Sequence, residues 1–265
     1  MSSTYARLCR EAQRIVLHTA EFIQGELGKV DQDRIETKSL NSLVSYVDKE
    51  AENLLVEGLT ELLPESVFFT EEDTTENAEG EWQWIIDPLD GTTNFLHQIP
   101  VFCISVALRY QEELVLGIIY EINRKEFFYG WKGGGVFLNQ SPVRVRQNNE
   151  LANALLATGF PYYDYERTDP YLACLKYFIQ NTRGIRRLGA AAVDLAYVAC
   201  GRFDGFYEYS LQPWDVAAGA FLVQEAGGVI TDFSGGDNYL FGNEVIAAGP
   251  SIHSAMHKVI GKHFP

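Results

Sequence analysis

Apolar residues recur every three to four positions along two long segments near the start of the chain. The first segment covers residues 5–28, and the second runs from Val47 to Leu62. This spacing places the apolar side chains on one face of a helix, which can pack against a core. We therefore expect two amphipathic helices, with Asp48 in the first turn of the second, where an acid interacts favourably with the helix dipole.

From residue 66 onward the pattern changes to short runs rich in β-branched and aromatic residues, which predict strands. The predicted strands cover residues 66–70, 82–87, 101–109, 114–121, 127–131 and 136–138. Polar or glycine-containing breaks separate the last four, and such breaks favour an antiparallel meander. One break, residues 133–135, consists of three glycines. No Lys-Ser or Lys-Thr pair follows them, so we interpret them as a turn and not as a phosphate-binding loop.

After Pro142 the chain alternates between strand and helix patterns. The predicted strands cover residues 154–158, 184–188, 203–209, 229–230 and 245–247, and the predicted helices cover residues 170–180, 191–200, 216–226 and 252–260. Asp169 is expected to cap the first of these helices. Such alternation is typical of α/β architecture. We therefore predict a mixed α+β and α/β fold, with an antiparallel N-terminal half (residues 1–143) joined without a flexible linker to an alternating α/β C-terminal half (residues 144–265).

Composition and charge limit the possible partners. With 265 residues and 46% hydrophobic residues, the chain is long enough to bury a large core. Lys and Arg number 21 against 36 Asp and Glu, which gives a formal net charge of -15. This charge repels nucleic acid and anionic membranes, so we expect neither as a partner. An anionic substrate would need bound metal ions to offset the field.

The cysteines and the hydropathy pattern indicate a soluble cytoplasmic protein. The four cysteines are Cys9, Cys103, Cys174 and Cys200. They lie in apolar stretches without a C-x-x-C pair, so we expect buried free thiols in a reducing compartment and not a zinc site or a disulfide framework. No apolar run approaches the roughly 20 residues that a membrane span needs.

The most informative stretch is W-I-I-D-P-L-D-G-T-T-N, residues 84–94. An apolar strand is expected to end at Asp87, because Pro88 has no N–H to donate to a neighbouring strand. Asp90 follows three residues later, Gly91 permits a sharp turn, and two threonines can open a helix. Two carboxylates and unpaired helix-start amides then share one corner. This combination suits a divalent cation that holds a phosphate group.

Two other interpretations of this stretch are open from the residues alone. Turns rich in Asp, Pro, Gly and Thr are common, so the stretch could be an ordinary capped turn. It also approaches the D-x-D-G-T motif of the haloacid dehalogenase phosphatases, in which the first Asp is a covalent nucleophile. Here one extra residue separates the two acids, which changes where the second carboxylate points.

Further acids and small residues lie at the ends of other elements. Glu71 follows the strand 66–70, so it can lie beside Asp87 if the two strands are neighbours. Asp215 lies at the start of a helix, and Glu208 lies near a strand end. Residues 189–192 open another helix with small side chains that leave its amides accessible. Each of these features also has a purely structural explanation. The acids can be solvated or cap a helix, and the small residues can allow close helix packing.

Two distant signatures resemble the inositol monophosphatase family, which belongs to a Mg²⁺-dependent superfamily of lithium-sensitive type. Residues 84–95 match the family pattern W-[IV]-[IV]-D-P-[IL]-D-G-T-x-N-[FY], and residues 214–219 with 225–228 match W-D-x-A-[AG]-[AG] followed by E-A-G-G. The family's G-E-E segment reads Thr70-Glu71-Glu72 here and departs only at its first residue. The resemblance runs from the first helix to about Ala248. It implies the layered αβαβα sugar-phosphatase fold.

The resemblance also implies a metal site. Its ligands would be Glu71, Asp87, Asp90, Asp215 and the main-chain carbonyl of Leu89, which would bind two to three Mg²⁺ ions with Asp87 as a bridge. Residues 1–143 would then carry most metal ligands, and residues 144–265 would carry Asp215 and the substrate wall, in one continuous catalytic unit. Metal ions about 3.5–4 Å apart can stabilise both the attacking and the leaving oxygen of an in-line displacement on phosphorus.

Roles for other residues follow from the same resemblance. Thr92, hydrogen-bonded to Asp48, would orient the attacking water, and Glu71, a further catalytic residue, would help to hold a third, weaker ion. The amides of Gly91, Thr92 and Thr93 would receive phosphate oxygens. The sugar hydroxyls would contact Glu208, the amide of Ala191 and the carboxylate of Asp90. No covalent enzyme intermediate is needed.

The expected reaction is hydrolysis of a phosphate monoester, myo-inositol monophosphate, by metal-activated water. The alternatives are fructose-1,6-bisphosphatase or 3'-phosphoadenosine 5'-phosphatase activity at the same metal site, and a non-catalytic inositol-phosphate-binding or regulatory protein. The resemblance further implies a homodimer. Aromatic residues 127–129 and 160–163 could supply apolar contacts to it, with core packing as the other explanation.

Overall fold

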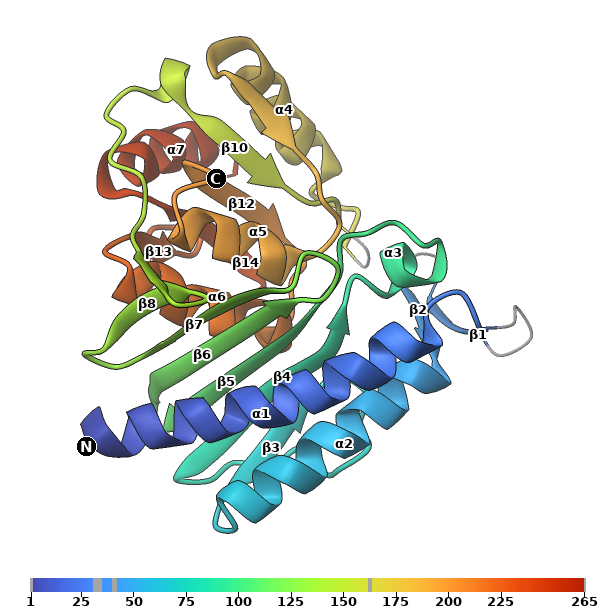
Figure 1. Cartoon of the computed structure of the whole chain (residues 1–265). Coiled ribbons are helices and arrows are strands. Elements are labelled where there is room, and N and C mark those ends of the chain that lie inside the picture. Colours follow the sequence, from blue (N-terminus) through green and yellow to red (C-terminus); the bar gives the residue numbers. More distant parts are fainter. Residues whose placement is uncertain (1, 31–34, 40–41, 162–163, 265) are drawn as a thin grey trace.

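The computed structural model describes residues 2–30, 35–39, 42–161 and 164–264 as five alternating layers of helix and sheet (Figure 1). The first sheet has seven strands in the order β3-β4-β5-β6-β7-β8-β9. These strands are β3 (Val67–Thr70), β4 (Trp82–Asp90), β5 (Cys103–Tyr110), β6 (Glu113–Glu121), β7 (Glu126–Trp131), β8 (Gly135–Leu138) and β9 (Ser141–Val143). Only β3 and β4 pair in parallel, and the others form the predicted antiparallel meander.

The second sheet has five strands in the order β11-β10-β12-β14-β13 and mixes parallel with antiparallel pairs. These strands are β10 (Leu155–Thr158), β11 (Gly184–Arg186), β12 (Gly205–Tyr209), β13 (Val229–Thr231) and β14 (Glu244–Ala248). A separate hairpin, β1 (Ile35–Ser39) with β2 (Ser42–Ser45), precedes the second helix.

Helices fill the other three layers. They are α1 (Ser2–Glu26), α2 (Tyr46–Leu62), α3 (Thr92–Leu96), α4 (Thr168–Asn181), α5 (Ala191–Ala199), α6 (Pro213–Glu225) and α7 (Pro250–His263), with a short 3-10 turn, η2 (Leu151–Asn153). Helices α1 and α2 cover the outer face of the large sheet, α5 and α6 lie between the two sheets, and α4 and α7 cover the outer face of the small sheet (Figure 1). The expected αβαβα layering is confirmed.

Three apolar cores fill the four interfaces between these layers, because the central core covers both faces of the middle helix layer. The central core joins residues of both sheets to α5 and α6, and one outer core lies under each outer helix pair. The amphipathic helices predicted at the start of the chain supply the first outer core through residues such as Leu8 and Leu55. The division at residue 143 coincides with the end of β9, and it stays a prediction.

Several local expectations were wrong or incomplete. Strand β4 does not end before Pro88 but runs on to Asp90, and its register with β5 shifts between Asp87 and Asp90. The proline lies in this irregularity, where its missing N–H interrupts no regular ladder. Helix α4 begins at Thr168, so Asp169 lies inside its first turn and does not cap it. The hairpin β1–β2 and strand β9 were not predicted.

The prediction that the cysteines are free thiols is confirmed. All four cysteines are free; Cys9, Cys103 and Cys174 are buried, and Cys200 is half-buried. Within the described part of the chain, no helix is long and apolar enough to cross a membrane.

One of the two aromatic segments proposed for dimer contacts is part of the core. Phe127 and Phe128 are buried because β7 is packed on both of its faces, so core packing explains them. Phe160 in the other segment is 47% exposed, whereas Tyr162 and Tyr163 lie outside the described residues.

Glycines allow the middle helices to approach their neighbours closely. A Cβ atom at Gly219 of α6 would lie 2.4 Å from the Cβ atom of Leu195 on α5. A Cβ atom at Gly117 of β6 would lie 2.8 Å from the carbonyl oxygen of Ala218. These contacts fix where the N-termini of α5 and α6 emerge between the sheets.

We expect Gly219→Ala to destabilise the protein by about 1–3 kcal/mol, because overpacking outweighs the gain in helix propensity of about 1 kcal/mol. The matched control is Gly261→Ala in α7, where the added Cβ would meet nothing within 4 Å. This control should gain about 0.5–1 kcal/mol. Urea unfolding of the two variants measures the difference, and equal midpoints would show that the α5–α6 contact can relax freely.

Candidate active site

A parallel strand pair and a strand irregularity bring the first three acids together. Thr70 of β3 pairs with Ile86 of β4, so Glu71 emerges beside Asp87 as expected. Side chains three residues apart on a regular strand point to opposite faces. The register shift between Asp87 and Asp90 removes this restriction, and both carboxylates reach one pocket. The amide of Leu89 donates to Oδ1 of Asp87 over 2.9 Å and stabilises the irregular segment.

Gly91 turns the chain from β4 into α3. Its φ of 95° lies in the left-handed region, which favours glycine. The hydroxyl of Thr92 then lies 2.7 Å from Oδ1 of Asp48 and 3.0 Å from the carbonyl oxygen of Leu89. Asp48 itself is fixed, because its Oδ2 accepts hydrogen bonds from the amide and the hydroxyl of Ser45. The predicted contact between Thr92 and Asp48 is therefore present.

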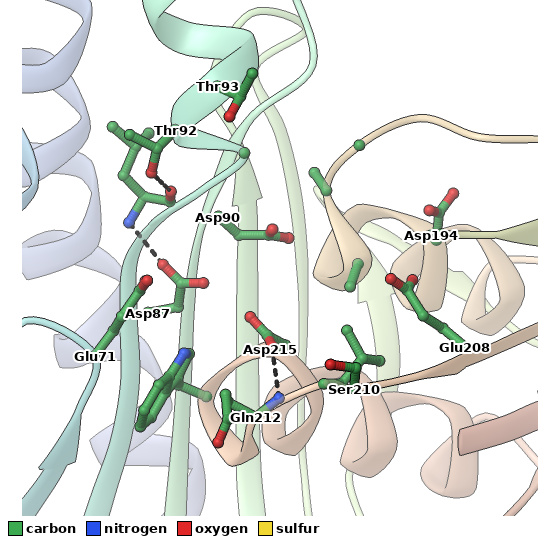
Figure 2. Close-up of a pocket in the computed structure, with 18 of the residues that line it drawn as sticks. Glu71, Asp87, Asp90, Thr92, Thr93, Asp194, Glu208, Ser210, Gln212 and Asp215 are labelled. Atoms are coloured by element: carbon green, nitrogen blue, oxygen red, sulfur yellow. Dashed lines mark hydrogen bonds between the residues drawn. The ribbon is translucent and has the colours of Figure 1, made fainter. Parts of the chain in front are cut away.

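The third aspartate comes from the other half of the chain. Asp215 lies in the first turn of α6, and its Oδ2 accepts the amide of Gln212 in a capping box. Asp90 accepts the amide of Ala192, at the start of α5, over 2.7 Å. Asp87, Asp90 and Asp215 each place one carboxylate oxygen within 4.8 Å of those of the other two. Figure 2 shows these three side chains converging from β4 and α6, with Glu71 beside them.

Burial and mutual repulsion disfavour ionisation of these carboxylates. The pKa of Asp87 is raised well above its usual value, first by burial and then by the charges of Glu71, Asp90 and Asp215. Burial raises the pKa of Asp90 to about 6, and burial with the charge of Asp90 raises that of Asp215 to about 7. A cation would remove this penalty. Several hard carboxylate oxygens at one point match the ligand preference of Mg²⁺, so the residues present fit such an ion.

The far side of the pocket is formed by the C-terminal half. Glu208 of β12 is buried, and a Cβ atom at Gly159 would lie 2.0 Å from its Oε1. Burial, followed by the charge of Asp215, raises the pKa of Glu208 well above its usual value. Ala191 and Asp194 come from the first turn of α5, and both line the pocket.

The structure brings together almost every residue that the sequence predicted for the site. The predicted residues that line the pocket are Glu71, Asp87, Leu89, Asp90, Gly91, Thr92, Thr93, Ala191, Glu208 and Asp215. Asp48 lies behind Thr92 and does not line it. The roles assigned to these residues stay predictions.

Sequence reasoning missed other residues that line the pocket, among them Gly159, Arg187, Asp194 and Ser210. A signal existed for Asp194, because it is a carboxylate within an apolar helix and lies three residues after Ala191, hence on the same helix face. Gly159 and Arg187 carry no comparable local signal.

The raised carboxyl pKa values predict a pH-dependent stability. These carboxylates bind more protons in the folded protein than in the unfolded chain from about pH 4 to about pH 7, so they make metal-free protein less stable as the pH rises through this range. His253, whose pKa burial lowers to about 4, acts in the opposite direction, but it is one group against several carboxylates. We expect EDTA-treated protein to have a higher Tm at about pH 5.5 than at about pH 7.5. Added Mg²⁺ should reduce or reverse this difference, because it binds the ionised carboxylates. Thermal unfolding at both pH values checks this, and a pH dependence unaffected by Mg²⁺ would contradict it.

Comparisons with known proteins agree with this architecture. The family model described as "Inositol monophosphatase family" matches residues 6–264. The chain is 42% identical over 262 residues to a protein of Neisseria meningitidis serogroup B named putative Nus factor SuhB, with 98% of each chain covered. It is 39% identical over 251 residues to an inositol-1-monophosphatase of Rhizobium meliloti, with 94% of each covered.

A solved structure also shares the fold over nearly the full length. The extragenic suppressor protein suhB from Bartonella henselae superposes with a TM-score of 0.89 at 37% identity, covering 94% of this chain and 96% of that one. Because the family model extends over nearly the whole chain and the acids of both signatures meet in one pocket, the chain belongs to the inositol monophosphatase family.

Proposed function

We propose that this protein is a Mg²⁺-dependent phosphatase that hydrolyses a phosphate monoester, with myo-inositol monophosphate as its substrate. The observation that carries the proposal is the meeting of Asp87, Asp90 and Asp215 within 4.8 Å, next to the amides at the start of α3. Carboxylates and helix-start amides in one pocket can hold a cation and a phosphate group together.

The metal ligands in this proposal are Glu71, Asp87, Asp90, Asp215 and the carbonyl of Leu89. Two to three bound Mg²⁺ ions would supply positive charge to the phosphate oxygens and activate water for in-line displacement. The protein's contribution is to fix the acids before an ion arrives. Asp87, Asp90 and Asp215 each accept a main-chain N–H, which orients the carboxylate in the pocket.

Thr92 positions the attacking water in this scheme. Its hydroxyl donates to the buried carboxylate of Asp48, so its oxygen is left to accept a hydrogen bond from water. Glu71 lies beside Asp87 and faces the same space (Figure 2). The amides of Gly91, Thr92 and Thr93 receive the phosphate oxygens, because the first amides of a helix have no partner within it.

The far wall favours a polyol over a bisphosphate. Among the described residues that line the pocket, Arg187 is the one cation, whereas Glu208 and Asp194 are acids. A second phosphate group would be repelled by these acids. Fructose 1,6-bisphosphate and 3'-phosphoadenosine 5'-phosphate are therefore the less favoured substrates.

A second candidate function comes from the names of the relatives. Proteins named Nus factor SuhB are similar over most of the chain, at 38–42% identity. A role as a Nus factor would be a function without catalysis, or a function in addition to catalysis. With a net charge of -15, we propose that a partner in such a role is a protein and not a nucleic acid.

We also propose a cytoplasmic homodimer. Free cysteines are typical of a reducing compartment. On α4, Leu172 and Ile179 are 49% and 60% exposed and lie seven residues apart, hence on one helix face. Phe160, whose ring packs against that of Tyr171 on the same helix, is also exposed, and a second copy can cover such apolar side chains. We expect light scattering to give twice the chain mass of 29.8 kDa, and a monomer mass at micromolar concentration would count against the dimer.

Phosphate release from a substrate panel tests the enzymatic proposal. The panel contains myo-inositol 1-phosphate, fructose 1,6-bisphosphate and 3'-phosphoadenosine 5'-phosphate. We expect release only with Mg²⁺, loss of activity in EDTA, and at least a tenfold preference in kcat/KM for the inositol ester. Equal turnover in EDTA would refute the metal mechanism, and a preference for a bisphosphate would replace the substrate. If no ester is hydrolysed, the non-catalytic function remains as the candidate.

A further inference from the structure

One buried carboxylate of the pocket has no ligand contact in the function proposed above. Asp194 is the fourth residue of α5, is only 1% exposed and lines the pocket. Its Oδ1 has no hydrogen-bond partner among the described residues. Leaving a buried acceptor unpaired is costly, and in native proteins such groups are few and require an explanation.

Asp194 lies beside a second buried carboxylate. Figure 2 shows Asp194 and Glu208 next to each other on the side of the pocket opposite Glu71 and Asp87. Apart from burial, the charge of Glu208 is the largest influence on the pKa of Asp194, and both effects raise it. The position of Glu208 depends on glycine at position 159, because a Cβ atom there would collide with the Glu208 carboxylate.

One cation partly offsets these charges. The guanidinium of Arg187 lies 5.3 Å from the centre of the Phe160 ring and lowers the pKa of both Asp194 and Glu208. Because a cation is already present, the wall does not require a cationic ligand. Its carboxylates are acceptors and repel anions, so a ligand group that fits must be neutral and rich in hydrogen-bond donors. The hydroxyls of a polyol ring have this character.

We propose that Asp194 is a specificity-determining residue that accepts a hydrogen bond from a ring hydroxyl of the substrate, next to the hydroxyl held by Glu208. The inference deepens the proposed function, since it rests on a phosphate monoester being bound at the metal side. Two adjacent acceptors make the wall selective for esters whose alcohol carries several hydroxyls. An ester without hydroxyls leaves both carboxylates unpaired and gains nothing from the wall.

Binding of two non-hydrolysable phosphonates tests this role without requiring turnover. The probes are the phosphonomethyl analogue of myo-inositol 1-phosphate and benzylphosphonate, which has no hydroxyl. Calorimetry in Mg²⁺ gives Kd of each probe for the wild type and for Asp194→Asn, which keeps the side-chain volume but removes one acceptor. We expect Kd for the inositol probe to rise about 10- to 100-fold and Kd for benzylphosphonate to stay within about twofold.

Asp204→Asn is the matched control. Asp204 is equally buried, at 2%, but it lies outside the pocket and accepts hydrogen bonds from Leu155 and Asn148. We expect this variant to lower Tm and to leave the ratio of the two Kd values unchanged. Asp194→Asn should change that ratio whatever its effect on Tm.

The outcomes separate this inference from the proposed function. Equal changes for both probes, or no change for either, would overturn the role of Asp194. Hydrolysis of myo-inositol 1-phosphate by the wild type is measured separately with Mg²⁺. A protein that binds the inositol probe through Asp194 without hydrolysing the ester would retain the inference and lose the enzymatic function.

A set of deoxy-inositol phosphonates, each lacking one hydroxyl, sharpens the test. The loss of affinity caused by Asp194→Asn should disappear for the analogue that lacks the contacted hydroxyl, as in a double-mutant cycle. A loss of the same size for every analogue would contradict a direct contact.

Discussion

Repulsion between buried carboxylates is the constraint on which the rest of the site depends. Asp87, Asp90 and Asp215 lie within hydrogen-bonding or coordinating reach of one point, where ionised acids are unfavourable. Each is held by a main-chain N–H from a different place: the irregular end of β4, the start of α5 and the turn before α6. Backbone donors therefore maintain an arrangement that the side chains alone would oppose.

The layered fold supplies these donors because its middle layer contacts both sheets. The hydrogen bond from Ala192 to Asp90 joins α5 to β4, and α6 brings Asp215 from the same layer. The helix N-termini are in place because small residues let α5 and α6 pack closely against each other and against β6. The positions of the acids thus depend on packing some distance from the pocket.

Local patterns predicted much of this arrangement. Helical periodicity located α1 and α2, and the W-I-I-D-P-L-D-G-T-T-N stretch identified the two acids of β4 and the turn at Gly91. Other features depend on contacts between distant segments. Pro88 lies where the regular pairing of β4 with β5 stops at Asp87 and begins again, in a shifted register, at Asp90. The local sequence did not predict this shift, because it depends on the pairing with β5.

The substrate wall was predicted less completely for the same reason. Glu208 and Ala191 were assigned to the wall through the family resemblance. Asp194 lies three residues after Ala191 on α5, and it lies beside Glu208 because α5 packs beside β12. In the sequence, Gly159 resembles an ordinary loop glycine. Its importance depends on the pairing of β10 with β12, which brings the Glu208 carboxylate into the space that a side chain at position 159 would fill.

The contact between Gly159 and Glu208 also makes the position of the Glu208 carboxylate independent of the acids of β4. The acids of β4 that are proposed to hold metal ions lie in one half of the chain, and the residue that leaves room for Glu208 lies at the end of β10 in the other. A single methyl group at position 159 would displace the Glu208 carboxylate and leave Asp87 and Asp90 with all of their backbone donors. Under the proposed function, the alcohol part of the substrate can therefore change during evolution without a change at the acids proposed to hold the metal ions.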